Sequence, residues 1–232
     1  MMIESSQPPF CQTDVTSSAV YMEDCIIGMK RYPDKFFNLA IVDVPYTDEY
    51  KNMQKLNTDM KGKQAKVGQY HYNSLSNAKP TKEYWDELKR VSKHQIVWGA
   101  NYLIEYLNST PCVIVWDKNN SGNFADCEIA FATFTTGAKI FKYTWNGMIQ
   151  QNMKDKEERI HPTQKPVALY EWLLKQYAKE EDLILDTHVG SGSSRIACQK
   201  NGFSFVGFEI DKTYFEAQEA RFKNFTAQHR LW

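Results

Sequence analysis

The stretch LILDTHVGSGSSRIACQKNGFSFVGFE, residues 183–209, decides the fold of this chain. An apolar run ends at Asp186 and is followed by small residues, a helical stretch over 195–200 and a second apolar run that ends at Glu209. This order is typical of a strand, a glycine turn, a helix and a second strand. Glycines in such a turn let the backbone approach a ligand closely, and an acid after the second strand can bind ribose hydroxyls. The stretch therefore predicts a site for a nucleotide-like cofactor, without saying which one.

The composition fits a globular protein of one large domain or two small ones. The chain has 232 residues, of which 42% are hydrophobic and 14% aromatic. Its formal net charge is zero, so any nucleic-acid surface must come from local charge asymmetry. No apolar run approaches the roughly 20 residues of a membrane span, and the first residues lack the parts of a signal peptide, so we expect no membrane contact and a cytoplasmic location. The five cysteines are scattered without a CxxC pair, which favours reduced thiols and no metal site.

Strand and helix patterns alternate along the chain. We predict strands at 38–42, 95–98, 111–116 and 203–208, and helices at 20–32, 81–92, 102–107, 167–178 and 211–225. The β-rich residues 128–136 and 139–145 are expected to pair as a hairpin. This alternation predicts an α/β domain with a largely parallel sheet, whose functional sites gather at the carboxyl ends of the strands.

A second candidate site follows the predicted strand 38–42. Pro45 cannot continue a central strand, so the chain must turn at Asp43-Val44-Pro45-Tyr46. The Asp43 carboxylate and the Val44 carbonyl can accept hydrogen bonds from an exocyclic amine, and Tyr46 can stack on its ring. Such handling of a base requires that the base leave the duplex. Because both turns follow strands, we expect this turn and the cofactor turn at one edge of the sheet.

Residues 51–82 differ from the rest because they contain seven lysines and one acid. We interpret residues 47–80 as a mobile basic loop, since long loops within compact domains are often functional. Basic residues interleaved with aromatics suit phosphates and bases, so Lys55, Lys61, Lys63 and Lys66 are candidate DNA contacts. A solvated insertion without a partner is the alternative.

Three segments together resemble the DNA amino-methyltransferases that use S-adenosylmethionine. Residues 43–46, DVPY, look like the family's D/N/S-P-P-Y signature; residues 186–192, DTHVGSG, resemble D-P-F-x-G-S-G; and residues 161–166, HPTQKP, resemble H-P-T-Q/E-K-P. The catalytic motif precedes the cofactor loop, which is the circularly permuted order of the β-class. The resemblance covers most of residues 20–225. It implies a single methyltransferase domain over 1–232 with a Rossmann-like fold, in which a mostly parallel seven-stranded-type sheet has helices on both faces.

The resemblance also implies residue roles. Four residues would hold the target base: Asp43, Val44, Pro45 and Tyr46. Ten would bind the cofactor: Asp24, Cys25, Thr163, Lys165, Asp186, His188, Gly190, Ser191, Gly192 and Glu209. Residues 117–160 occupy the place of a small target-recognition region, and no metal is implied.

Two positions depart from the family spelling. Val44 stands where the family has its first proline; a valine keeps the backbone carbonyl but loses rigidity. Thr187-His188 replaces Pro-Phe, whose phenylalanine packs beside the cofactor. Either departure could weaken activity.

The resemblance implies methyl transfer from S-adenosylmethionine to an exocyclic amine in double-stranded DNA. An aspartate at the first motif position points to adenine N6. Cytosine N4 and a catalytically weakened DNA-binding homologue remain alternatives, and a homodimer is compatible with the sequence. A nicotinamide-dependent oxidoreductase is less favoured, because Arg195 occupies the third glycine position of G-x-G-x-x-G.

Overall fold

The computed structural model describes residues 17–45, 79–120, 125–146 and 149–229. Tyr46, Lys55, Lys61, Lys63 and Lys66 therefore lie outside the described residues, as does nearly all of the predicted loop 47–80.

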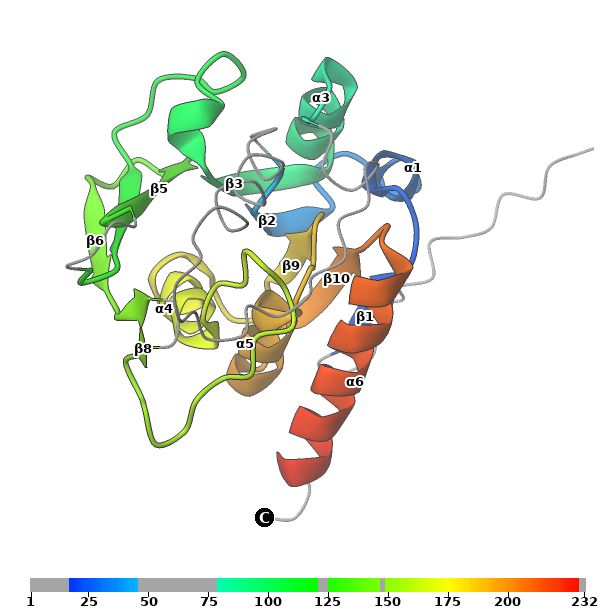
Figure 1. Cartoon of the computed structure of the whole chain (residues 1–232). Helices are drawn as coiled ribbons and strands as arrows, with labels where there is room; N and C mark the ends of the chain where they lie inside the picture. Colours follow the sequence, from blue (N-terminus) through cyan, green and yellow to red (C-terminus); the bar gives the residue numbers. More distant parts are fainter. Residues whose placement is uncertain (1–16, 46–78, 121–124, 147–148, 230–232) are drawn as a thin grey trace, which may run out of the picture.

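One eight-stranded sheet organises the described residues (Figure 1). Its order is β1-β10-β9-β2-β3-β5-β4-β6, and a separate two-stranded sheet pairs β7 with β8. The strands are β1 (Ser18–Tyr21), β2 (Phe37–Val42), β3 (Ser92–Trp98), β4 (Val113–Asp117), β5 (Cys127–Ala132), β6 (Lys139–Lys142), β7 (Trp145–Asn146), β8 (Ile149–Gln150), β9 (Leu183–Asp186) and β10 (Ser204–Phe208). The helices are α1 (Cys25–Met29), α3 (Lys82–Val91), the 3₁₀ turn η1 (Ala100–Tyr102), α4 (Val167–Tyr177), α5 (Ser193–Asn201) and α6 (Lys212–His229).

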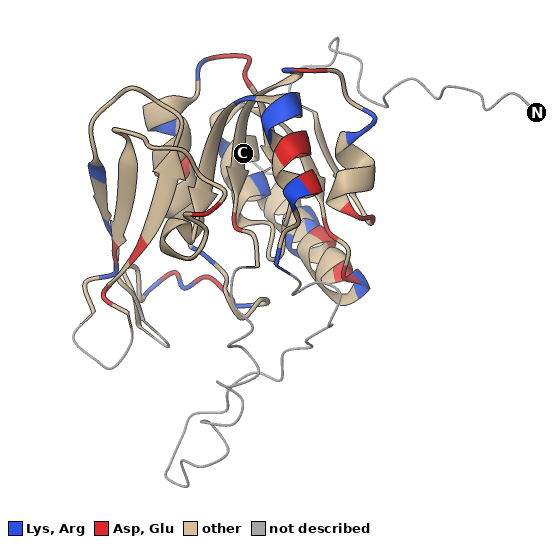
Figure 2. Ribbon diagram, turned by 90° about the horizontal axis from the view of Figure 1, so that it is seen from above, with Lys and Arg blue, Asp and Glu red and all other residues tan. Residues whose placement is uncertain are grey.

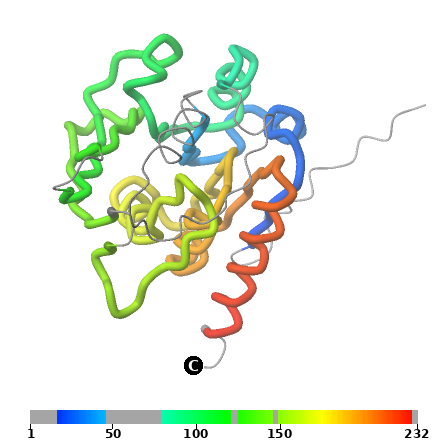
Figure 3. The backbone as a smooth tube through the Cα atoms, viewed as in Figure 1, coloured from blue at the N-terminus to red at the C-terminus, as the bar shows by residue number. Residues whose placement is uncertain are grey.

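The sheet is mostly parallel, as the sequence predicts. β1, β10, β9, β2 and β3 run parallel, and only β5 runs against its neighbours β3 and β4. Figure 3 shows the first described strand beside β10, near the end of the chain, so the sheet joins segments far apart in sequence. The sheet has eight strands rather than seven because β6 extends one edge by pairing with β4.

Three predicted elements differ in the structure. The predicted helix 20–32 is wrong at its start, because residues up to Tyr21 pair with β10 and the side chain of Asp24 caps a helix that begins only at Cys25. The predicted helix 102–107 is replaced by η1 and a turn. The predicted hairpin is also wrong, because both sides of β5 are already occupied by β3 and β4, so β6 pairs with β4 instead.

Helices cover both faces of the sheet (Figure 1). One core lies between the sheet and α4 and α5, and includes Leu173, Leu174 and Ile196. The other lies beneath α1 and α3, and includes Met29, Tyr84 and Leu88. Burial of these apolar faces is the main favourable contribution to the stability of the fold.

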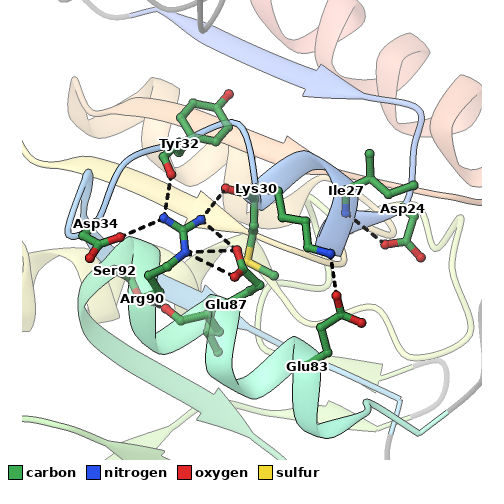
Figure 4. Close-up of polar contacts among 11 residues, drawn as sticks. Asp24, Ile27, Lys30, Tyr32, Asp34, Glu83, Glu87, Arg90 and Ser92 are labelled. Carbon is green, nitrogen blue, oxygen red and sulfur yellow. Dashed lines mark hydrogen bonds and ion pairs between the residues drawn. The ribbon is translucent and has the colours of Figure 1, made fainter.

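Arg90 of α3 joins this helix to the segment that follows α1. Its guanidinium donates to the carbonyl oxygen of Tyr32 (2.8 Å) and to the carboxylate of Glu87 (2.7 Å), as Figure 4 shows. It also donates to the carbonyl oxygen of Met29, the last residue of α1 (3.1 Å). Charge-assisted bonds to two carbonyls fix one helix against the other better than an exposed ion pair would. The hydrogen bonds of Arg90 therefore fix α1 relative to α3, and both helices begin beside the candidate site.

Among the described residues, no helix combines the length and apolar character needed to cross a membrane. Over the described residues, Lys and Arg are interspersed with Asp and Glu (Figure 2).

Candidate active site

A cavity of about 230 Å³ lies where the parallel strands end. Six short segments contribute most of its lining: residues 23–26, 43–45, 79–81, 161–165, 187–191 and 208–210. These segments follow β1, β2, β9 and β10 or precede α1, α3 and α4. The two turns that the sequence placed at one sheet edge therefore meet in one cavity.

Most of the predicted site residues that the structure describes line this cavity. They are Asp24, Cys25, Asp43, Val44, Pro45, Thr163, Lys165, His188, Gly190, Ser191 and Glu209. Asp186 and Gly192 do not line it. The part of the chain that the structure describes has no cluster of metal-binding side chains.

The glycine turn and Glu209 form one hydrogen-bonded unit. Gly190 N donates to Glu209 Oε2 (2.9 Å), and Asp211 N donates to Oε1 (2.8 Å). Gly190 has a φ of 52°, a backbone conformation that side-chain-bearing residues rarely adopt. Burial raises the pKa of Glu209, and the backbone N–H groups oppose that rise. The carboxylate is thus held by two amides and keeps acceptor capacity toward the cavity, as ribose hydroxyls require.

Asp186 and Gly192 support the turn from outside the cavity. Asp186 accepts from His188 N (3.0 Å) and from Ser194 Oγ (2.5 Å), so it joins the turn to the start of α5. Gly192 has a φ of 72°, and a Cβ there would lie 3.2 Å from Cβ of Gln218. Both residues therefore shape the turn, and their predicted contact with the cofactor stays a prediction.

The beginning of α1 supplies a second acid and a thiol. Asp24 Oδ1 caps the helix by accepting from the backbone N–H groups of Ile26 (2.7 Å) and Ile27 (3.3 Å). Burial, assisted by the charge of Asp24, raises the pKa of Cys25 to about 12. Cys25 is therefore a neutral thiol at physiological pH and not a nucleophile.

The segment 161–165 packs over the glycine turn. A Cβ on Gly190 would lie 3.5 Å from the ring of His161, an ordinary van der Waals contact, so the positive φ rather than lack of space favours glycine here. The His161 ring lies 4.3 Å from that of Tyr214, and its Nδ1 lies 3.1 Å from Thr163 Oγ1. Burial and the nearby charge of Lys165 lower the pKa of His161 to about 4. The His161 ring thus lines the cavity in its neutral form.

The dipeptide Thr187-His188, which differs from the Pro-Phe of the family motif, is part of a buried hydrogen-bond network. The hydroxyl of Thr187 lies 2.7 Å from that of Tyr84 on α3 and 2.9 Å from His188 Nδ1. The rings of Tyr84 and His188 meet edge to face at 5.7 Å. Burial lowers the pKa of His188 to about 4, so its ring is neutral, as a stand-in for phenylalanine requires.

The turn after β2 places a carboxylate beside an ammonium. Lys165 Nζ forms an ion pair with Asp43 Oδ2 and lies 3.1 Å from Glu128 Oε2. Burial raises the pKa of Asp43; Lys165 lowers it, and Glu128 raises it further. The side chain of Val44, at the family's first proline position, is buried in the core beneath α3, and this packing restrains the turn in place of the missing ring.

Sequence reasoning missed three polar residues around this site: Tyr84, Lys118 and Glu128. Tyr84 falls within the predicted helix 81–92, and that prediction does not specify which residues its side chain contacts. Lys118 and Glu128 fall in the segment assigned to target recognition. Only the antiparallel direction of β5 reveals that Glu128 lies near Asp43, and no local pattern encodes that direction.

A mostly parallel sheet with a glycine turn after one strand and an acid after the next defines a Rossmann-like α/β protein with a site for a nucleotide-like cofactor. The chain belongs to the DNA methylase family of N6/N4 methyltransferases, whose model matches residues 16–220. It is 30% identical over 126 residues to the type II methyltransferase M2.LlaDCHI of Lactococcus lactis subsp. cremoris, covering 53% of this chain and 46% of that relative. The chain thus spans less than half the length of the first curated relatives that it matches.

Two solved structures share the fold. The M1.HpyAVI complex with SAM has a TM-score of 0.52 at 20% identity, covering 88% of this chain and 99% of that one. The cytosine-N4-specific PvuII DNA methyltransferase has a TM-score of 0.59 at 13% identity, covering 90% and 87%. At these identities the likeness establishes the α/β methyltransferase fold.

Proposed function

We propose that this chain is an S-adenosylmethionine-dependent DNA methyltransferase that acts on the exocyclic amine of a flipped base, with adenine N6 as the target. The observation that carries the proposal is the meeting of Asp43-Val44-Pro45 with the Gly190–Glu209 unit in one cavity. Family membership supports the activity, and the SAM complex of a protein with the same fold supports the cofactor.

The cavity fits the cofactor by the chemistry of its lining. Glu209 offers a carboxylate to ribose hydroxyls, and the turn at Gly190 lets the backbone approach a ligand. Asp24 and Cys25, which the family resemblance also assigns to the cofactor, line the same cavity. When bound, S-adenosylmethionine supplies a methyl group on a cationic sulfur, which the lone pair of an amine nitrogen can accept.

The turn after β2 orients the amine. Asp43 accepts a hydrogen bond from the exocyclic NH₂ group, and the Val44 carbonyl accepts a second. These bonds direct the two hydrogens away from the lone pair, which weakens its delocalisation into the ring and frees it for attack. Holding both reactants in this geometry contributes much of the rate. Asp43 or solvent then takes the proton that the nitrogen loses.

The decisive experiment measures transfer of a tritiated methyl group to double-stranded DNA and identifies the methylated nucleoside. We expect N6-methyladenine, and we expect Asp43→Ala to abolish transfer while binding of S-adenosylmethionine, followed by calorimetry, persists. N4-methylcytosine would instead support the chemistry of the PvuII enzyme, whose fold this chain shares. DNA binding without transfer would identify a weakened homologue, and unchanged turnover in Asp43→Ala would refute the role of Asp43.

The lysines of the 47–80 segment and the 117–160 region are proposed to contact DNA. Replacing Lys55, Lys61, Lys63 and Lys66 together with Ala should weaken DNA binding and flatten its salt dependence, because fewer phosphates would be neutralised. Binding that keeps its affinity and its salt slope would exclude a DNA role for these lysines.

A further inference from the structure

Four charged side chains form a continuous series beside the cavity. Lys118 Nζ lies 2.5 Å from Glu128 Oε1, Glu128 Oε2 lies 3.1 Å from Lys165 Nζ, and Lys165 pairs with Asp43. Two ammonium groups alternate with two carboxylates, so the series is neutral when all four are ionised. Only Asp43 and Lys165 line the cavity; Glu128 and Lys118 stand behind them.

The sheet topology brings these residues together. β2 and β3 run parallel, so Asp43 follows β2 at the edge where β3 ends at Trp98. β5 runs antiparallel to β3 and therefore begins at that edge, where it carries Glu128. β4 ends there as well, one residue before Lys118. The series is thus a consequence of the single reversed strand in the sheet.

Lys165 is the least accessible member, with its side chain 3% exposed. A buried ammonium is costly unless carboxylates surround it. The ring faces of Trp98 and Trp116 limit hydration further, since Lys165 Nζ lies 5.6 Å from the first ring centre and Lys118 Nζ lies 5.0 Å from the second. With Asp43 as its only carboxylate, Lys165 would compete directly with any amine that Asp43 must bind.

We propose that Glu128 is a positioning residue for the reaction at Asp43: it shares the Lys165 ammonium and becomes its main partner when Asp43 accepts a hydrogen bond from the target amine. This inference rests on the proposed function. Lys165 needs no long movement for the exchange, because Glu128 Oε2 already lies 3.1 Å away. Lys118 keeps Glu128 ionised, since the two lysines together outweigh the effect of burial and lower the pKa of Glu128.

The same arrangement preserves Asp43 as a proton acceptor. When the nitrogen–carbon bond forms, the sulfur–carbon bond breaks with its electron pair going to sulfur, and the nitrogen carries one proton too many. Asp43 can take that proton while Lys165 remains an ammonium. Besides Lys165, Glu128 and Lys118, the ionisable groups near Asp43 within the described part of the chain are Asp186 of β9 and Tyr170 of α4. The carboxylate of Glu128 carries a negative charge that favours protonation of Asp43, and Glu128→Gln removes this charge.

The test compares Glu128→Gln with Glu171→Gln. Glu171 of α4 is a matched control, because it also pairs with a lysine, Lys200, and is similarly exposed (20% against 23%). At saturating DNA and cofactor, we expect Glu128→Gln to slow single-turnover methyl transfer roughly ten- to hundredfold, as when a group that orients a reactive ligand is lost. The acidic limb of its pH–rate profile should move to lower pH, because Asp43 then faces Lys165 without the opposing charge. Glu128→Asp should recover part of the rate, and cofactor affinity should stay unchanged.

A carboxyl-labelled aspartate NMR titration supplies a readout independent of turnover, with the Asp43 signal assigned by its loss in Asp43→Asn. We expect the Asp43 pKa to fall in Glu128→Gln and to stay in place in Glu171→Gln. An Asp43 titration that does not move, or equal loss of rate in the two Gln variants, would overturn the proposal. If the wild-type protein methylates no DNA, the proposed function itself is refuted. If the wild type is active and Glu128→Gln changes neither the rate nor the Asp43 pKa, only the positioning role of Glu128 is refuted.

Discussion

Lys165 and Asp43 are 122 positions apart in the chain, yet their side chains form an ion pair in the wall of the cavity. The pair unites two motifs, HPTQKP and DVPY, that the sequence presents as separate. The family resemblance assigns Lys165 to the cofactor, and its ammonium also lies against the carboxylate proposed to bind the target amine.

Replacing Lys165 with Met should raise the pKa of Asp43. Burial and Glu128 raise the pKa of Asp43, and Lys165 lowers it. Without the Lys165 ammonium, burial and Glu128 therefore raise this pKa further. The acidic limb of the pH–rate profile should therefore move to higher pH, opposite to the shift expected for Glu128→Gln. The rate of methyl transfer near neutral pH should fall on the order of a hundredfold, because the pKa of the proton acceptor is shifted from its working value.

The control for this variant is Lys200→Met, which breaks an ion pair with Glu171 away from the cavity. Its pH–rate profile should match that of the wild type. A Lys165→Met profile that moved to lower pH would contradict the assigned electrostatics.

The positions of Asp43 and Glu209 could be predicted from sequence because each follows a short apolar run directly. Strand ends and glycine turns are local features, and parallel strands place their carboxyl ends at one edge. The same reasoning placed Asp186 in the site but did not predict that its carboxylate accepts from His188 N and Ser194 Oγ. A side chain's direction at a strand end depends on the turn that follows, which the pattern of residue types does not specify.

The contacts of Glu128 and Tyr84 could not be predicted, because they depend on which strands and helices become neighbours. A one-residue change of register would turn Glu128 to the other face of the sheet. The misassigned start of α1 has a similar origin: β1 forms by pairing with β10, which is more than 180 positions away in sequence, and that long-range pairing overrides the local helical spacing.

Replacing Glu209 with Ala should weaken cofactor binding. The variant loses the carboxylate and leaves the N–H of Gly190 without its acceptor. A hydrogen bond that involves a charged group contributes about 1.5–3 kcal/mol, so affinity for S-adenosylmethionine should fall at least roughly tenfold. Calorimetry measures the change directly.

Glu216→Ala removes an exposed carboxylate of α6 that pairs with Lys212, and it should leave the affinity unchanged. Equal affinity in Glu209→Ala and the wild type would show that the acid after β10 does not bind the cofactor.

Replacing Asp186 with Asn should change how stability depends on pH. Burial raises the pKa of Asp186 from its usual 3.8 to about 7, although Ser194 and the His188 amide lower it. Because the folded pKa is raised, the contribution of this group to stability is fully present below the unfolded pKa and is lost as the pH rises through about 7. Asn carries no charge at any of these pH values, so the loss should be absent in the variant.

Urea unfolding of both proteins at about pH 5 and about pH 8 tests this linkage. The free energy of unfolding of Asp186→Asn, relative to wild type, should increase with pH. A relative stability that is constant or falls over this range would contradict a raised pKa for Asp186.

The Thr187 hydroxyl should couple energetically to Tyr84. Thr187→Val removes the oxygen that lies 2.7 Å from the Tyr84 hydroxyl and 2.9 Å from His188 Nδ1, which leaves the buried Tyr84 hydroxyl and the half-buried His188 ring without this partner. The expected loss is about 1–3 kcal/mol of unfolding free energy. Tyr84→Phe should cost less, because Thr187 keeps its contact with His188.

A double-mutant cycle measures the coupling between Thr187 and Tyr84. Since the second substitution removes a bond that the first has already broken, the double variant should be more stable than the sum of the single losses predicts, by about 0.5–3 kcal/mol. Strictly additive losses would mean that the two hydroxyls contribute separately. Coupling would instead show that Thr187-His188, the dipeptide that departs from the family's Pro-Phe, is held in place by α3, so that His188 can present a neutral ring to the cavity as the family's phenylalanine would.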